Sequence, residues 1–112
     1  MTVPASQLDF SQMQDSAGQA CGLLKAMANE ARLMVLCHLI EGERSVTELQ
    51  DAVGLSQSAM SQHLAVLREQ EIVATRRDGQ SVYYRISNDH AMAVMETLHR
   101  EFCEAPRGNG CG

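Results

Sequence analysis

Uncharged hydrogen-bonding side chains gather on one face of a helix predicted over residues 57–70. The apolar residues of this segment recur at helical spacing, so that amide and hydroxyl groups share the opposite face. Such groups near a helix N-terminus can enter the major groove of DNA and hydrogen-bond to base edges. An ordinary solvated helix face is the alternative interpretation. The residues predicted to contact DNA from this helix are Gln57, Ser58, Ser61, Gln62, His63 and Arg68. His63 is next to the inward-facing Leu64, which also predicts a structural hydrogen bond for its ring.

A hairpin is predicted directly after this helix. Residues 72–77 and 81–86 alternate in polarity, and Asp78-Gly79 between them is a strong turn signal. The tip adds Arg76, Arg77 and Gln80 to the predicted DNA contacts, with Arg77 and Gln80 expected at phosphate or sugar. Residues 56–85 hold four arginines against three acidic residues, in a chain of net charge −5. A polyanion is therefore attracted to this segment and repelled by the rest.

Thiols are the second group of reactive side chains. Cys37 falls inside an apolar helix, and Cys103 ends the last predicted helix, 66 residues later. Thiolates attack sulfane sulfur, and a second thiol can then capture the persulfide. A small buried hydrophobic residue at Cys37 and an exposed thiol without a role at Cys103 are the alternatives. His99, one turn before Cys103, would with Cys37 supply three of the ligands that zinc or copper prefers, and a fourth is missing.

Five helices and one hairpin are predicted to position these groups. Apolar residues from Phe10 to Met27 follow a heptad seam, which favours a helix paired with a second subunit over one packed on its own core. A capping box at Ser11 is predicted to start this helix, and Asn29 to cap the next, which ends at Gly42. A second capping box, Ser45 to Glu48, opens a short helix, and Asn88 or Asp89 caps the last.

The order of these elements predicts a mainly α chain with a small β-hairpin, the arrangement of a winged helix-turn-helix. We expect the domain to span residues 10–103, between flexible segments at 1–9 and 104–112. The 112-residue chain has 45% apolar and 4% aromatic residues, which suits one small helical domain. No run approaches the ~20 apolar residues of a membrane span, and no secretory signal is evident, so we expect a cytoplasmic protein. No enzyme motif is found, whereas a protein-interaction adaptor stays open.

The motifs, taken in order, resemble the ArsR/SmtB repressors over roughly residues 16–103. The resemblance implies a homodimer through the first and last helices, bound to an AT-rich inverted-repeat operator and released by an inducer. The segments that carry it are Ala28-Asn29-Glu30-Ala31-Arg32-Leu33, Ser45-Val46-Thr47-Glu48-Leu49, residues 55–64 from Leu55 to Leu64, and Arg77-Asp78-Gly79-Gln80 with Tyr83-Tyr84.

The chain lacks the ligand patterns of the metal-sensing members of this family, and this difference suggests another kind of inducer. Residues 48–53 contain no cysteine, and His90 and His99 lack the spacing of an interfacial zinc site, so no metal or cofactor is carried over. Cys37 and Cys103, in their contexts, resemble the sulfide- and persulfide-responsive BigR/SqrR branch and the HlyU-like regulators. That branch implies an intrasubunit di- or polysulfide between the two cysteines, formed with reactive sulfur species, that lowers operator affinity. A metal-responsive repressor and an HlyU-like anti-silencing regulator are the alternatives.

Overall fold

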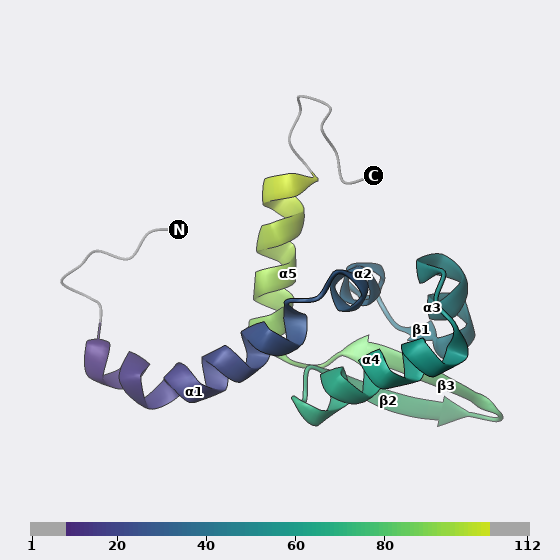
Figure 1. Ribbon diagram of the computed structural model, residues 1–112, viewed down its shortest axis with the longest axis horizontal. Coiled ribbons are helices and arrows are strands. Elements are labelled where there is room, and N and C mark those ends of the chain that lie inside the picture. The colour runs from purple at the N-terminus through teal and green to yellow at the C-terminus, as the bar shows by residue number, and fades with distance from the viewer. Residues whose placement is uncertain (1–8, 104–112) are drawn as a thin grey trace.

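The computed structural model describes residues 9–103, so the predictions for segments 1–8 and 104–112 lie outside the described residues. The predicted winged helix-turn-helix is confirmed, with five helices and a small antiparallel sheet (Figure 1). In chain order the elements are α1 (Phe10–Met27), α2 (Glu30–Leu39), β1 (Arg44–Ser45), α3 (Val46–Val53), α4 (Gln57–Glu69), β2 (Val73–Asp78), β3 (Ser81–Ile86) and α5 (Asp89–Phe102).

Polar caps fix most of the helix starts where the sequence predicts them. The Ser45 hydroxyl accepts from the Glu48 backbone N–H at 3.1 Å, and the Glu48 carboxylate accepts from the Ser45 N–H at 2.8 Å, which completes the predicted capping box. Asn29 caps α2 as predicted. The cap predicted at Ser11 is wrong, because the carboxylate of Asp9 accepts the Gln12 N–H at 3.0 Å and starts α1 two residues earlier.

The sheet contains one strand that the sequence does not predict. Strand β1 is only two residues long and pairs with β3, which gives the order β1-β3-β2. Two residues are too few to show an alternating pattern, so β1 exists only through its tertiary partner. The predicted turn at Asp78-Gly79 is also shifted, because Asp78 still pairs with Ser81 and the connection is Gly79-Gln80. Gly79 has a φ of +64°, which suits glycine in such a turn.

The core lies between α2, α3, α4, the inner face of the sheet and the first half of α5 (Figure 1). Its fully buried large side chains are Val35, Leu36, Leu39, Leu49, Met60, Leu67 and Ile72.

Helix α1 extends away from this core, as Figure 1 shows. Its seam residues Phe10, Met13 and Leu24 are 75%, 62% and 52% exposed, and Phe102 at the end of α5 is 64% exposed. A single chain therefore leaves apolar surface on the two helices predicted to form a dimer. Within residues 9–103, no helix has the length and apolar character that crossing a membrane requires.

The Ser45–Glu48 box provides a test of local stability. Ser45→Ala should lower the free energy of unfolding by about 1 kcal/mol, because one N-terminal N–H of α3 loses its acceptor. Backbone hydrogen bonding from Ser45 lowers the pKa of Glu48, so the contribution of its carboxylate holds above the ordinary glutamate pKa and fades as pH falls through the lowered value. Urea unfolding at several pH values measures both effects. The exposed Thr47→Ala in the same helix is the control, and an equal loss in the two variants contradicts the assignment.

Candidate nucleic-acid interface and thiol site

Helices α3 and α4 are held at a turn by two local features. Gly54 ends α3 in the left-handed region with a φ of +77°, and the Ser56 hydroxyl accepts the Ala59 N–H at 3.1 Å to start α4. Met60, Leu64 and Leu67 then face the core, so the opposite face of α4 is solvent-exposed. The predicted contact residues on that exposed face are Gln57, Ser58, Ser61, Gln62 and Arg68.

His63 differs from the other predicted contact residues of α4. It is half-buried, and its Nδ1 lies 3.3 Å from Nη1 of Arg32 on α2. The structural hydrogen bond predicted for this ring is therefore present, and its partner could not be read from the sequence. Within residues 9–103, the five exposed residues of α4 make no comparable side-chain hydrogen bond to another helix.

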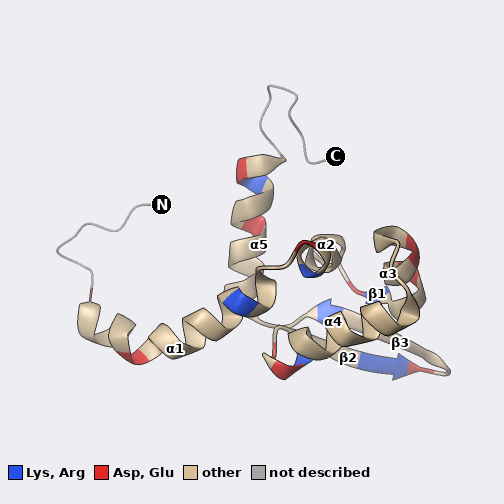
Figure 2. Cartoon of the chain, in the orientation of Figure 1, with Lys and Arg blue, Asp and Glu red and all other residues tan. Residues whose placement is uncertain are grey.

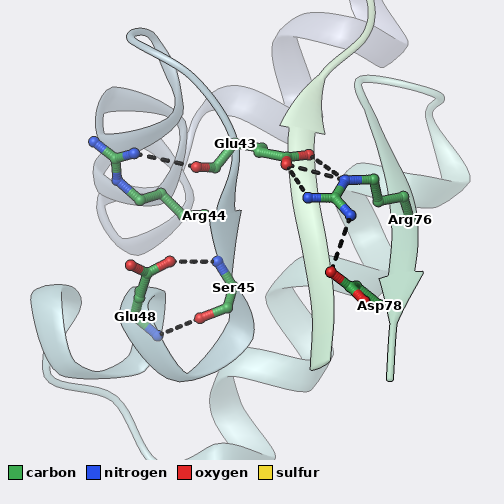
Figure 3. A network of polar contacts seen from close by, with 6 residues as sticks. All are labelled: Glu43, Arg44, Ser45, Glu48, Arg76 and Asp78. Carbon is green, nitrogen blue, oxygen red and sulfur yellow. Dashed lines mark hydrogen bonds and ion pairs between the residues drawn. The ribbon is translucent and has the colours of Figure 1, made fainter. Parts of the chain in front are cut away.

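Of the predicted contact residues on the hairpin, one is held by other side chains of the protein and two are exposed. Arg76 is engaged within the protein: its Nε donates to both carboxylate oxygens of Glu43, at 3.0 and 3.1 Å (Figure 3). Its Nη1 lies 3.8 Å from the Asp78 carboxylate, and its Cζ lies 4.6 Å from the ring centroid of Tyr83, its cross-strand partner. Arg77 and Gln80 are exposed at the tip.

Glu43 is the partner of Arg76, and the sequence analysis does not predict it. It immediately precedes β1, and the pairing of that unpredicted strand with β3 brings its carboxylate over the sheet. The hydrogen bond from Arg76 lowers the pKa of Glu43, and the same bond raises the pKa of Arg76. Both groups are therefore charged at neutral pH and largely cancel one another. Among the cationic residues that colour β2 in Figure 2, the charge of Arg77 is the more available one.

The structure brings Cys37 and Cys103 to one apolar cavity between α2 and α5. Both line a space of about 210 Å³, together with Leu33, Met34, Met95, Leu98, His99 and Phe102. Cys37 is half-buried and also borders a larger, more polar cavity of about 560 Å³, lined by Ile40, Glu41, Glu96, His99 and Arg100. Cys37 thus has an apolar side facing the second cysteine and a polar side open to a charged cavity.

The oxidation states of these residues are not equal. Cys37 is a free thiol, as is the exposed Cys21. Cys103 is disulfide-bonded in this structure, so its bond is not with Cys37. Within residues 9–103, no three His, Cys, Asp or Glu side chains are arranged to hold a metal ion, and the set Cys37, His99 and Cys103 does not form such a group.

Comparison with known proteins agrees with this architecture. Residues 29–75 match the model of the bacterial regulatory proteins of the arsR family. The chain is 47% identical over 98 residues to the transcriptional activator HlyU of Vibrio cholerae, covering 88% of this chain and 91% of that protein. It is 39% identical over 102 residues to the biofilm growth-associated repressor of Xylella fastidiosa, covering 91% and 88%.

Solved structures give the same relationship. Reduced HlyU from Vibrio cholerae superposes with a TM-score of 0.79 at 49% identity, covering 82% of this chain and 97% of that one. The transcriptional repressor BigR from Xylella fastidiosa superposes with a TM-score of 0.79 at 38% identity, covering 86% and 98%. These relatives are transcriptional regulators rather than enzymes, and the match extends through the helix-turn-helix, the hairpin and the flanking helices. The chain is thus a DNA-binding transcriptional regulator and belongs to the ArsR family.

Proposed function

We propose that this regulator is a homodimeric repressor that senses reactive sulfur species through Cys37 and Cys103. The observation that carries the proposal is the shared apolar cavity, which two cysteines 66 residues apart line from α2 and α5. The lining of this cavity is almost entirely apolar, and its volume admits a small sulfur chain between the two helices.

The chemistry needs only the two thiols and a persulfide, RS–SH. Starting from the reduced pair, the Cys37 thiolate attacks the sulfane sulfur, forms Cys37–S–SH and releases RS⁻. The Cys103 thiolate then attacks Sγ of Cys37, forms the Sγ–Sγ bond of a disulfide, breaks the bond to the outer sulfur and expels HS⁻. A donor that leaves additional sulfurs on Cys37 gives a polysulfide by the same displacement. A direct disulfide needs Cα atoms within about 7 Å, whereas a longer sulfur chain spans a wider gap.

A covalent bond between α2 and α5 can change the geometry of the DNA-binding face through the packing of α2. Helix α2 contacts both α3 and α4, so a displacement of α2 changes the base on which the helix-turn-helix rests. Helix α5 carries exposed apolar surface at Phe102 and belongs to the proposed dimer interface. A tenfold loss of operator affinity corresponds to about 1.4 kcal/mol, a modest bias for one covalent bond.

We assign the DNA contacts to two groups of residues. The base-reading group comprises Gln57, Ser58, Ser61 and Gln62, whose amides and hydroxyls suit base edges, and the backbone group comprises Arg68, Arg77 and Gln80. Two-fold symmetry sets the recognition helices about 34 Å apart, one turn of the duplex. His63 and Arg76 contribute through their protein partners, Arg32 and Glu43, instead of by free side chains.

The thiol proposal predicts that Cys37→Ser and Cys103→Ser each retain DNA binding and lose induction. The test uses reduced protein, an AT-rich inverted-repeat duplex and fluorescence anisotropy, before and after treatment with cysteine persulfide. Wild-type protein should lose at least about tenfold in affinity. Cys21→Ser, which removes an exposed free thiol, is the matched control and should respond like wild type.

Parallel arms with peroxide and with zinc separate the alternatives. Release by zinc but not by persulfide supports the metal-responsive alternative. Release of either Cys37→Ser or Cys103→Ser from DNA by persulfide shows that the two-thiol switch is wrong.

The two arginines of β2 should differ in their salt dependence. Arg77→Gln should reduce the slope of log affinity against log salt by about 1, because one phosphate contact is lost. Arg76→Gln should change it less, since Glu43 already neutralises Arg76, and Glu43→Gln should raise the slope by releasing that guanidinium. Anisotropy titrations between low and moderate salt measure these slopes. Equal effects of Arg76→Gln and Arg77→Gln contradict the assignment.

A further inference from the structure

We infer that Arg32 is a positioning residue that fixes the angle of recognition helix α4 against dimer helix α1, and thereby sets the half-site spacing that the dimer accepts. The inference depends on the proposed role of α4 in reading DNA, and it is independent of the cysteine switch. Its basis is one guanidinium that hydrogen-bonds to the end of α1 and the middle of α4 at the same time.

The first contact is with the end of α1. Arg32, in the first turn of α2, donates from Nε to the Ala26 carbonyl at 2.5 Å and from Nη2 to the Lys25 carbonyl at 3.5 Å. The last carbonyls of a helix lack partners within the helix, so they are natural acceptors for a cation. The planar arginine fork can satisfy them and still direct another N–H elsewhere.

The second contact is with α4. Nη1 of Arg32 lies 3.3 Å from Nδ1 of the half-buried His63. Because arginine has no acceptor, the contact requires Nδ1 of His63 to accept, which assigns the ring proton to Nε2 in the neutral ring. His63 follows Gln62 of the base-reading group and precedes Leu64 of the core, so this bond acts at the middle of the DNA-binding helix.

Helix α1 also contacts the far end of α4, through the side chain of an exposed residue. A Cβ atom added to Gly22 would lie 2.9 Å from Oε1 of Gln70, the residue that caps α4. Seven residues separate His63 from Gln70, or about 10 Å along a helix. Because Gln70 is an exposed, flexible side chain, the hydrogen bonds of Arg32 are the stronger constraint on the direction of α4 relative to α1.

This constraint matters because α1 carries the exposed seam expected at the dimer interface. Phe10, Met13 and Leu24 lie on the same helix whose end Arg32 holds. The position of each recognition helix relative to the dimer interface is therefore set through α1. The two recognition helices must enter successive major grooves about 34 Å apart. Without the Arg32 bridge, α4 can tilt, and the dimer should tolerate half-sites at incorrect spacing.

The test compares three duplexes: an inverted repeat selected in vitro with wild-type protein, and its derivatives with one base pair inserted or removed between half-sites. Arg32→Gln should lower the preference for the selected spacing by about fivefold, because binding to the altered duplexes weakens less than binding to the selected one. Arg32→Lys should give an intermediate value, since one ammonium cannot hold both helices. Arg100→Gln removes the same charge from a residue that hydrogen-bonds to Thr97 of its own helix, and it should keep the wild-type preference.

Two variants of His63 test the same hydrogen bond from its other partner, in case Arg32→Gln does not fold. His63→Asn places an acceptor near the Nδ1 position and should retain the spacing preference, whereas His63→Leu should lose it. Thermal unfolding and light scattering confirm that each variant is a folded dimer. A uniform loss of affinity at all three spacings shows a merely structural role for Arg32. An unchanged preference in a folded Arg32→Gln dimer likewise overturns the inference.

Discussion

The burial of helix α2 is the constraint on which the rest of the structure depends. Val35, Leu36 and Leu39 are at most 1% exposed, and the helix contacts α1, α3, α4, α5 and β3. Close-packed interiors do not deform continuously, so a change at one side of α2 must be accommodated at the others. A helix in this position can connect chemistry at α5 with geometry at α4 without any dedicated pathway.

The two ends of α2 serve these two purposes. Near its N-terminus, Arg32 holds the end of α1 and the ring of His63, which orders the DNA-binding helix. Near its C-terminus, Cys37 faces the cavity that it shares with Cys103 and a second, polar cavity. The proposed positioning residue and the proposed reactive thiol are therefore about one and a half helical turns apart on one rigid element. A bond at Cys37 needs only a small displacement of α2 to disturb what Arg32 holds.

Most of the fold could be predicted because its signals are local. Caps at Asn29, Ser45 and Ser56, the apolar stripe of α4 and the glycine turn of the hairpin depend on nearby residues alone. The errors arose where a partner distant in sequence decides the outcome. Strand β1 is an example, since it is defined by its pairing with β3. The early start of α1 is a local error instead, because two nearby residues, Asp9 and Ser11, could each cap the helix and Asp9 does so.

The candidate site was predictable in composition and less so in its arrangement. Residue types identified the exposed polar face of α4, and the family resemblance selected Cys37 and Cys103, which the fold brings to one cavity. The engagement of Arg76 by Glu43, 33 residues away, and of His63 by Arg32, 31 residues away, required the tertiary structure. The sequence predicted a structural hydrogen bond for His63 without its partner, and it predicted Arg76 as a DNA contact without Glu43, because long-range partners leave no periodic signal.

The most direct measurement of the central claim is peptide mapping by mass spectrometry of persulfide-treated protein, separated into operator-bound and operator-free fractions. Peptides containing Cys37 and Cys103, joined through two or more sulfurs, should be concentrated in the operator-free fraction. An operator-free fraction in which these two peptides are unlinked, after persulfide has weakened DNA binding, would contradict it.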